Sequence, residues 1–340
     1  MTDNSLVELF TEELKLCEVG SGHSVAVLSE GSLLREYAES SLLAASKLGA
    51  KVIDVNLPVS HPASVSERIA DLGVSCLSRF PDHLKRCSEA DMVIDHTLLL
   101  FSEEQVRIQK AGARMLMVVE PREVLERLLP SADLRKCVEA GEKALSAAKK
   151  LRFINDIGSD ITYNLGENNI LAEYGYTTKP GRWDHWPSGF LATIATKNGV
   201  NGRVVMNCGD IIYPLTKHVE SAIEFIVEEG NVVEVNGGAD ARLLVDFMES
   251  YKDERAYSVS HIGWGLNKNC LWTVDTPGIG MDGRAYCGNV LFSLGPDTEF
   301  GGKNNTRCHL DLPMRNCSLF LDEQIVVEQG EIVPSAMRMP

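Results

Sequence analysis

The chain has 340 residues, of which 44% are hydrophobic and 24% are charged, and its formal net charge is −15. This composition is typical of a globular protein, and the length allows two domains with cores of their own. The acidic balance, without a cluster of Lys and Arg, excludes a nucleic-acid backbone as the main partner. Nine scattered cysteines without a C-x-x-C pair predict neither a disulfide framework nor a zinc knuckle.

Nothing in the sequence predicts a membrane segment or a secretory signal. The first 17 residues interrupt their apolar side chains with Glu8, Glu12 and Glu13, unlike a signal peptide. The apolar runs are all too short to span a bilayer as a helix. We therefore expect a cytoplasmic protein that has no contact with a membrane.

The first half of the chain alternates between strand and helix patterns. Apolar runs predict strands at 24–28, 51–57, 91–99 and 114–119. Helical patterns occupy 5–17, 32–48, 65–72, 83–89, 102–111, 121–129 and 132–151, with capping boxes expected at Ser5 and Ser102. Such alternation is typical of a parallel sheet covered on both faces. No glycine-rich nucleotide motif follows the first strand, which disfavours a nucleotide-binding role.

The second half has a different texture, with short β-like runs separated by Gly, Asn and Pro. Strands are predicted at 203–206, 210–212, 223–228 and 231–235, with a hairpin turn at Gly230 and a helix at 240–249. The fold class is therefore α/β, with a parallel-sheet α/β domain at 1–150 and a mostly antiparallel, β-rich (α+β) domain at 151–340. The G-x-G-x-x-G at 278–283 follows no buried strand and opens no predicted helix, so we expect a loop there.

An aromatic-rich segment follows the boundary, EYGY at 173–176 and PGRWDHWPSGF at 180–190. It has neither helical nor strand periodicity, and we expect a structured loop over a pocket or a subunit interface. Its tryptophans could equally fill the end of a sheet. Glu173, Arg182, Asp184 and His185 are candidate functional residues, because burying ionisable groups is costly unless they are paired or used.

Cys308-His309-Leu310-Asp311 near the C-terminus is a candidate metal site. If 306–312 is a strand, His309 and Asp311 lie on one face, and His261 upstream could supply a third ligand. Two histidines and one carboxylate are the ligands of non-haem Fe(II) oxygenases. An H-x-D pair also arises by chance. In the glycine-rich stretch before it, Arg284 could anchor an anionic oxygen or form a surface salt bridge.

The motifs EYGY, PGRWDHWPSGF, SHIGWGL at 260–266 and GGK…CHLD at 301–311 closely resemble the 2,5-dihydroxypyridine 5,6-dioxygenase family. GAR at 112–114 and VEP at 119–121 extend the resemblance over nearly the whole chain. It implies an Fe(II)-dependent enzyme that uses O2 to open a small aromatic N-heterocycle between C5 and C6, giving N-formylmaleamate in the breakdown of nicotinate or nicotine. It also implies kinship in fold with the M29 aminopeptidases and a homo-oligomer.

For the site, the resemblance implies Fe(II) ligands His261, His309 and Asp311, and a substrate pocket that includes Glu173, His185, Arg284 and Ser293. The sequence departs from the family at Phe101, where a histidine proposed as acid/base is usual. Phenylalanine cannot move a proton. His96, His185 or a water could replace it, and His185 is preferred because a regular strand would turn His96 away from Phe101. Cys287 also replaces an aromatic residue, which could enlarge the pocket.

Three other functions compete with this prediction. An M29-like metallo-aminopeptidase would need further Glu ligands for a second metal, and His261 stands where one of them is expected. A 2-oxoglutarate oxygenase would place its third ligand downstream, yet no histidine follows His309. A binding protein with a dead site would not need the complete three-ligand set. For a hydroxypyridine dioxygenase, Glu173 or His185 would take the substrate's hydroxyl proton, while His96 and Phe101 would line the pocket.

Overall fold

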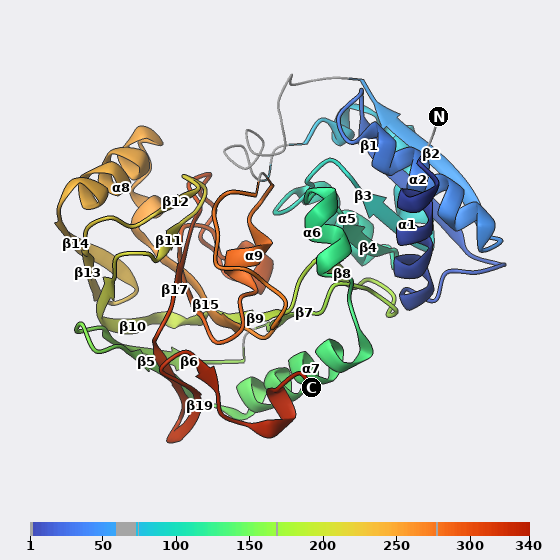
Figure 1. Cartoon of the computed structure of the whole chain (residues 1–340). Coiled ribbons are helices and arrows are strands. Elements are labelled where there is room, and N and C mark those ends of the chain that lie inside the picture. The colour runs from blue at the N-terminus through green and yellow to red at the C-terminus, as the bar shows by residue number, and fades with distance from the viewer. Residues whose placement is uncertain (1–2, 59–72, 74, 168, 277) are drawn as a thin grey trace. The chain divides into compact units, whose positions relative to one another are not determined.

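The structure is a computed structural model that describes residues 3–58, 73, 75–167, 169–276 and 278–340. It divides into two compact units, shown in Figure 1: unit 1 consists of Met1–Ser131 and Tyr174–Ser188, and unit 2 of Ala132–Glu173 and Gly189–Pro340. The two units do not follow the boundary that we expected at residue 150. Residues 132–150 belong to unit 2, while 174–188 return to unit 1.

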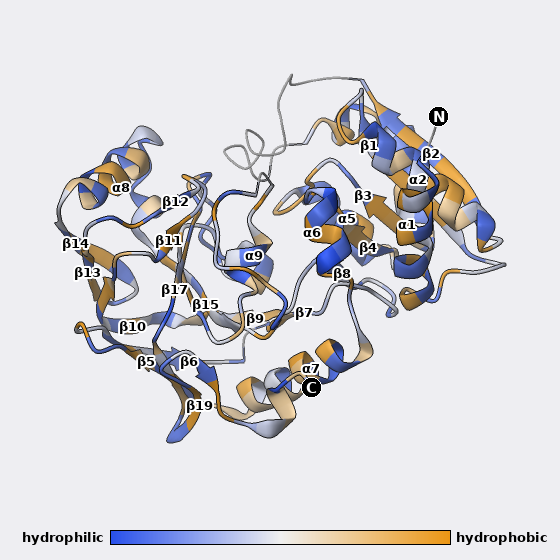
Figure 2. Ribbon diagram, in the orientation of Figure 1, coloured by the Kyte–Doolittle hydropathy of each residue, from blue (hydrophilic) through white to orange (hydrophobic). Residues whose placement is uncertain are grey.

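Unit 1 is built on a five-stranded parallel sheet with the order β2-β1-β3-β4-β8. Its strands are β1 (Ser24–Glu30), β2 (Lys51–Leu57), β3 (Met92–Asp95), β4 (Arg114–Met117) and β8 (Trp183–His185). β3 and β4 are buried along their whole length and are coloured as apolar in Figure 2. Burial on both faces explains their mostly apolar sequences, and the predicted parallel sheet is confirmed.

The helices of unit 1 are α1 (Asn4–Leu16), α2 (Arg35–Lys47), η2 (Leu77–Arg79), α4 (Pro81–Glu89), α5 (Glu103–Lys110) and α6 (Arg122–Arg127). Ser102 caps α5 as predicted, because its hydroxyl accepts the Gln105 N–H. The predicted cap at Ser5 is wrong. The Asp3 carboxylate accepts the Ser5 N–H at 2.9 Å and starts the helix earlier. The predicted helix at 65–72 lies outside the described residues.

The third strand is shorter than the predicted 91–99 because its last residue turns the chain. β3 ends at Asp95, whose carboxylate accepts the N–H groups of Thr97 and Leu99 at 2.7 and 2.8 Å. Leu98 and Phe101 then adopt the left-handed backbone region, with φ of 62° and 63°. The argument that strand alternation separates His96 from Phe101 therefore fails, since neither residue lies in a strand.

We expected the aromatic-rich segment to be a loop, but part of it forms a strand. Trp183–His185 form β8, which pairs in parallel with β4 at the edge of the sheet of unit 1. Asp184 organises the preceding turn, since its carboxylate accepts the Gly175 N–H at 3.0 Å and pairs with Arg182 at 2.6 Å. A three-residue strand between Gly and Pro is too short to show a period in the sequence.

Unit 2 contains two larger sheets whose pairings are all antiparallel, which confirms the predicted β-rich fold. The eight-stranded sheet has the order β14-β13-β10-β6-β5-β18-β19-β20, and the five-stranded sheet, which we name the site sheet, has the order β17-β16-β15-β9-β7. A small pair consists of β11 (Ile211–Ile212) and β12 (Lys217–His218).

The larger sheet consists of β5 (Lys150–Ile154), β6 (Asp160–Leu165), β10 (Ala195–Met206), β13 (Ile223–Glu228), β14 (Asn231–Gly237), β18 (Ser318–Leu321), β19 (Gln324–Glu328) and β20 (Glu331–Ile332). The site sheet consists of β7 (Leu171–Glu173), β9 (Phe190–Thr193), β15 (Val259–Gly265), β16 (Val290–Leu294) and β17 (Leu310–Met314). The helices of this unit are α7 (Ala132–Ala147), α8 (Ala239–Ser250), η3 (Glu254–Tyr257), α9 (Met281–Arg284), η4 (Thr298–Phe300) and η5 (Ser335–Met337).

Two local predictions in unit 2 are wrong and one is confirmed. The helix expected at 132–151 ends at Ala147, because Lys150–Ile154 pair as β5. The loop expected at 278–283 contains the start of the short helix α9 at Met281. The predicted hairpin joins β13 to β14, and Glu229 and Gly230 turn the chain with φ of 49° and 79°.

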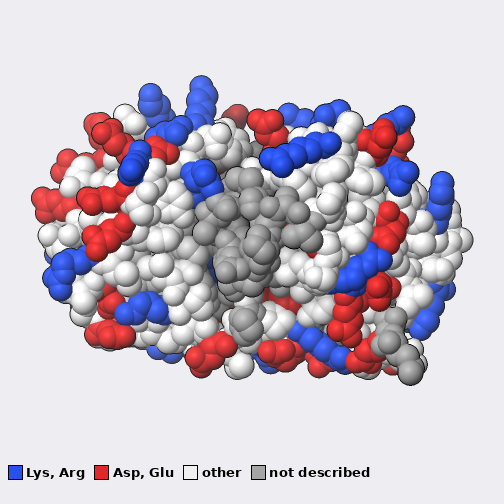
Figure 3. All heavy atoms as spheres, turned by 90° about the horizontal axis from the view of Figure 1, so that it is seen from above, with Lys and Arg blue, Asp and Glu red and all other residues white. Residues whose placement is uncertain are grey.

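In the part of the chain that the structure describes, no helix is long and apolar enough to cross a membrane. On the face seen in Figure 3, Lys and Arg side chains lie interspersed with Asp and Glu. This mixture agrees with the scattered basic residues of the sequence, and it does not resemble the continuous basic surface that binds a phosphate backbone.

Candidate metal centre

Three neighbouring strands of the site sheet carry the candidate metal site. β15 contains His261, β16 contains Ser293, and β17 contains Asp311, directly opposite Ser293 in the register. His309 lies immediately before β17, because the strand starts at Leu310 rather than at the predicted residue 306. The spacing of His309 and Asp311 nevertheless directs both side chains to one place.

An irregularity in β15 directs His261 towards its partners. Val259 pairs with Leu294 and Ile262 with Phe292, so that two residues, Ser260 and His261, stand opposite Ser293 alone. Such a β-bulge locally changes the direction of a side chain, and bulges are frequent beside active sites. The alternation of an ideal strand therefore does not decide which way His261 points.

The ligand atoms of His261, His309 and Asp311 lie within 4.8 Å of one another. His261 Nε2 is 3.1 Å from Asp311 Oδ1, and His309 Nε2 is 3.2 Å from Asp311 Oδ2. All three residues are buried, with 6%, 7% and 4% exposure in the order His261, His309, Asp311. Among the described residues, this is the group of His, Cys, Asp or Glu side chains that could hold a metal ion.

The hydrogen bonds of Ser260 present the Nε2 lone pair of His261 to the site. The Ser260 hydroxyl donates to the carbonyl of Pro296, so its oxygen is left to accept from His261 Nδ1 at 3.4 Å. A proton on Nδ1 leaves Nε2 unprotonated. This is the usual arrangement in which an outer partner fixes the tautomer of a metal-binding histidine.

The charges around the site favour the protonation states that bind metal. Burial alone would raise the pKa of Asp311, but the neighbouring His309 and Arg284 outweigh it and hold that pKa well below its usual range. Burial lowers the pKa of His261, although Asp311 opposes the shift. At neutral pH the site therefore combines a carboxylate anion with a neutral imidazole.

The donor set fits a metal cation. Ser293 Oγ lies 2.8 Å from His261 Nε2 and 2.5 Å from Asp311 Oδ1, so that one hydroxyl proton faces two acceptors. A third acceptor, His309 Nε2, lies 3.2 Å from the same carboxylate. A cation among these lone pairs satisfies all three ligands at once, and their nitrogen and oxygen atoms suit a first-row transition metal.

Arg284 and Phe300 hold the ligands from outside. Arg284 Nε donates to Asp311 Oδ2 at 2.7 Å, and Arg284 Nη1 donates to the carbonyl of Ile279. Phe300 stacks on the His261 ring with centroids 5.2 Å apart. The sequence did not indicate Ser260 or Phe300 as supports of the ligands. The only available signal was their position, since Ser260 precedes His261 and Phe300 precedes the glycine pair at 301–302.

The other predicted site residues fall in both units. Glu173 ends β7 of the site sheet and is buried, with Phe190 of β9 as its register partner. His185 is the last residue of β8 in unit 1 and is also buried. The geometry within unit 2 thus places Glu173 in the same sheet as the metal ligands.

His96 is bonded inside the core of unit 1. Its Nδ1 lies 2.8 Å from the Val118 carbonyl and its Nε2 lies 3.1 Å from the Ser41 hydroxyl, so both ring nitrogens have protein partners. Burial lowers its pKa to about 4. Phe101, also in unit 1, is half-buried and has a left-handed backbone. These contacts give His96 a structural role.

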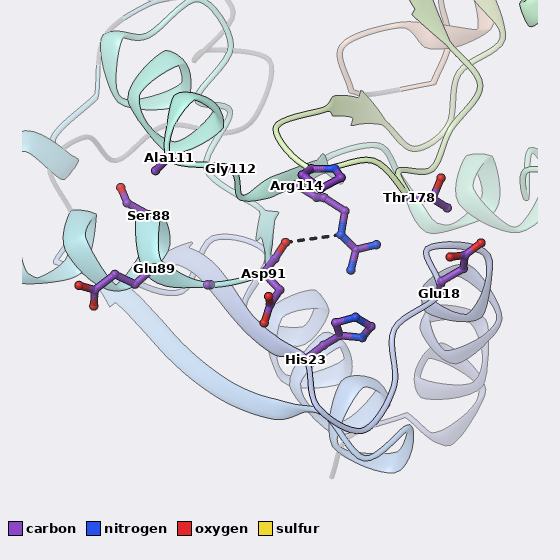
Figure 4. Close-up of a pocket in the computed structure, with 11 residues that line it drawn as sticks. Glu18, His23, Ser88, Glu89, Asp91, Ala111, Gly112, Arg114 and Thr178 are labelled. Carbon is purple, nitrogen blue, oxygen red and sulfur yellow. Dashed lines mark hydrogen bonds between the residues drawn. The ribbon is translucent and has the colours of Figure 1, made fainter.

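Unit 1 also has a surface cavity of about 630 Å³, shown in Figure 4. It is lined by Glu18, His23, Asp91 and Arg114, among others, and the Arg114 Nε donates to the Asp91 carbonyl at 3.5 Å. The cavity lies where β1, β3 and β4 begin. Ligands of open parallel sheets bind at the opposite, carboxyl ends of the strands, so its position is not that of a usual ligand site.

Two imidazoles and one carboxylate, from β15 and from the start of β17, define a site of the class found in mononuclear non-haem oxygenases. The comparisons with known proteins agree with this class. The sequence profile of the NicX family, described as 2,5-dihydroxypyridine 5,6-dioxygenase, matches residues 5–334. The chain belongs to this family, and it is therefore an oxidoreductase of the dioxygenase type.

One curated relative is 2,5-dihydroxypyridine 5,6-dioxygenase of Pseudomonas putida strain KT2440, which is 40% identical over 98% of this chain and 97% of its own length. The solved structure of 2,5-dihydroxypyridine dioxygenase from the same strain superposes with a TM-score of 0.94, covering 99% of this chain and all of the other. Wild-type AmpT from Thermus thermophilus, at 17% identity and a TM-score of 0.64 over 97% of this chain and 99% of its own, shares the fold.

Proposed function

We propose that the chain is a cytoplasmic, mononuclear Fe(II) dioxygenase that opens 2,5-dihydroxypyridine, or a closely related hydroxypyridine, between C5 and C6. The observation that carries the proposal is the convergence of His261, His309 and Asp311 in a chain 40% identical to a dioxygenase of that name. Addition of one O2 to the dihydroxypyridine balances as N-formylmaleamate, with both oxygen atoms in the product. This reaction belongs to the breakdown of nicotinate or related pyridines.

Fe(II) held by His261, His309 and Asp311 would bring the ring and O2 into one geometry and supply electron density to O2. The ligand set supports this role, because two histidines and one carboxylate leave coordination positions for both reactants. Asp311 is held as an anion and His261 is held with its Nε2 lone pair exposed to the site. The protein therefore has no proton to displace from these two ligands before a cation binds at neutral pH.

Arg284 and Ser293 are the proposed substrate contacts nearest these ligands. Arg284 uses Nε and Nη1 on Asp311 and Ile279, and we propose that its Nη2 donates to an anionic ring oxygen. The Ser293 hydroxyl lies between His261 and Asp311 and would turn to donate to the same ring once a cation occupies the two acceptors. Both side chains are buried, which excludes competing water.

His185 and Glu173 are the proposed groups that move the substrate proton. Phe101 has no proton to donate or accept, so another residue must replace the histidine that is usual there in the family. Glu173 is a carboxyl group in the site sheet and His185 is a buried imidazole, and both kinds of group can accept and donate a proton. His96 and Phe101 would only line the substrate pocket and would take no part in proton transfer.

The metal assignment is tested by His309→Ala, with His218→Ala of the same unit as the control. The protein is purified anaerobically and reconstituted with Fe(II), and iron content and O2 uptake with 2,5-dihydroxypyridine are measured. We expect about one iron per chain in wild type, and loss of both iron and O2 uptake in His309→Ala alone. Full activity of His309→Ala, or two metal ions per chain as the M29 aminopeptidase alternative requires, would contradict the proposal.

The acid/base assignment is tested by His185→Gln, with His83→Gln of unit 1 as the control. A general base contributes roughly 10²–10⁴-fold to the rate. We expect the kcat of the variant to fall by about 10²-fold or more, in line with that range. The variant should also lose one limb of its pH–rate profile while it still binds iron. An unchanged pH profile would transfer the role to Glu173 or to water.

We also propose that the protein is a homo-oligomer, which the family resemblance supports. Light scattering coupled to size-exclusion chromatography measures its mass directly. A single species at the 37.3 kDa of one chain would contradict this part of the proposal.

A further inference from the structure

One aromatic residue, Tyr213, bonds with its backbone to the backbone of Asp311 and packs its ring against Arg284, which holds the Asp311 carboxylate. Its N–H donates to the Asp311 carbonyl at 2.9 Å, and its own carbonyl accepts the Asp311 N–H at 3.2 Å. Its ring lies 4.2 Å below the guanidinium carbon of Arg284. Arg284 in turn donates from Nε to Asp311 Oδ2. Tyr213, Arg284 and Asp311 thus form a closed set of contacts.

The glycine motif at 278–283 makes room for this ring. A Cβ on Gly280 would lie 2.3 Å from Tyr213 Cε1, and a Cβ on Gly283 would lie 2.8 Å from the Tyr213 hydroxyl oxygen. Gly280 also has a left-handed φ of 83°, which favours glycine. α9 then ends at Arg284, so the short helix places the guanidinium over the ring. The motif therefore serves the packing of Tyr213 and not the binding of a nucleotide.

We propose that Tyr213 is a positioning residue for the metal carboxylate, acting through Arg284. A buried cation over an aromatic ring is stabilised by the charge distribution of the ring. The ring also limits the rotamers of a side chain that would otherwise move freely. With Arg284 held in place, Asp311 keeps the orientation in which one oxygen faces His261 and the other faces His309. This inference rests on the proposed function, because it assumes that Asp311 binds the metal.

The test measures the affinity of the full-length protein for Co(II), as a redox-stable probe, and for Fe(II) under anaerobic conditions. Wild type is titrated first, and it must bind about one ion for the proposed function to stand. Outer partners of metal ligands typically contribute 10- to 100-fold in affinity. We expect Tyr213→Leu to raise the Kd about tenfold, in line with that range, and Tyr213→Phe to restore most of the affinity because the ring is kept.

A matched control is Trp272→Leu, which removes another arginine–aromatic pair of unit 2, Arg315 over Trp272 at 5.0 Å. It should leave the Kd unchanged. Circular dichroism and thermal melts identify a variant that has failed to fold. If Tyr213→Leu fails to fold, Tyr213→Phe is used instead, and the Co(II) absorption spectrum measures the coordination of the ion. A Phe variant with altered coordination would place the effect in the hydroxyl, and so overturn the role assigned to the ring.

A double-mutant cycle with Arg284→Met separates action through Arg284 from an independent effect. If Tyr213 acts through Arg284, Tyr213→Leu weakens metal binding much less in the Arg284→Met background than in wild type. Additive losses would overturn the inference, as would a Tyr213→Leu protein that binds Co(II) as tightly as wild type. In either case the wild-type titration stands, so the proposed function is judged separately. If wild type binds no metal, the proposed function itself fails.

Discussion

At the scale of single residues, two of the three candidate ligands, His261 and Asp311, depend on neighbours that are not themselves candidate ligands. Ser260 sets the tautomer of His261, Phe300 stacks on its ring, and Arg284 holds Asp311. These supports lie on three separate elements, β15, η4 and α9. A donor set of this kind is ordered before any ion binds, which lowers the entropic cost of binding.

Ser260→Ala should weaken metal binding, because it removes the acceptor that keeps the proton on His261 Nδ1. Part of the population would then carry the proton on Nε2, where it blocks the metal. We expect the Kd for Co(II) to rise about tenfold, the lower end of the usual range for outer partners. The control is Ser258→Ala, whose exposed hydroxyl bonds Asn231 instead. Equal affinities of the two variants would contradict the tautomer assignment.

The closeness of His309 and Asp311 could be predicted from the sequence, whereas the residues that support the candidate ligands could not. His309 and Asp311 are two apart, and even though β17 starts only at Leu310, that spacing kept them together. His261 was a candidate third ligand because it is a histidine upstream, and the family resemblance implied the same role; the bulge in β15 breaks the alternation that would have shown its direction. Tyr213 lies almost 100 positions before Asp311, and no periodicity connects the two.

At the scale of elements, the site sheet requires a glycine at the position where β15 pairs with β9. A Cβ on Gly263 would lie 1.8 Å from the Leu191 carbonyl oxygen. Gly263→Ala must therefore push the two strands apart and should destabilise the protein by roughly 2 kcal/mol or more, as overpacked core positions do. Urea denaturation measures the change. Gly20→Ala, whose Cβ would meet only the Leu48 oxygen at 4.0 Å, is the control, and a similar small effect for both would contradict the prediction.

His96 makes the stability of unit 1 dependent on pH. Its folded pKa of about 4 lies below the ordinary value of 6.5, because burial disfavours the charged ring. The unfolded chain therefore takes up a proton near pH 6.5 that the folded chain refuses until about pH 4, and stability falls as the pH drops through this window. The loss attributable to His96 is about 3 kcal/mol at the acidic end.

The pH prediction is checked by urea denaturation of wild type and His96→Gln between pH 7 and 4. Gln keeps a donor and an acceptor near Val118 and Ser41 but cannot titrate. We expect a flatter dependence in the variant, with His83→Gln retaining the wild-type slope. Parallel curves for wild type and His96→Gln would show that His96 is not the group responsible.

Elements were predictable where their pattern is long and local. β2 and β13 match the predicted 51–57 and 223–228 because β-branched and other apolar residues recur throughout each stretch. β8 was missed because three residues between glycine and proline show no period, and their strand exists only through pairing with β4. The end of α7 was missed because the helical pattern runs on into β5.

At the scale of the whole molecule, the chain crosses between its two compact units more often than its sequence suggested. Residues 132–173 belong to unit 2 and 174–188 to unit 1. The texture of the sequence changes near residue 150, where strands replace helices, but α7 already belongs to the β-rich unit. Membership of a unit is decided by long-range packing, such as that of Gly141 of α7 against Leu191 and Trp264, which local composition does not encode.

The central claim, that the chain adds both atoms of O2 to a hydroxypyridine ring, is tested most directly with ¹⁸O2. Anaerobically purified protein is loaded with Fe(II) and given 2,5-dihydroxypyridine under labelled O2, and the product is analysed at once by mass spectrometry. The account predicts N-formylmaleamate that carries two labelled oxygens, one O2 consumed per ring, and no reaction with His309→Ala. A product with one label and one oxygen from water, or ring loss without O2, would contradict it.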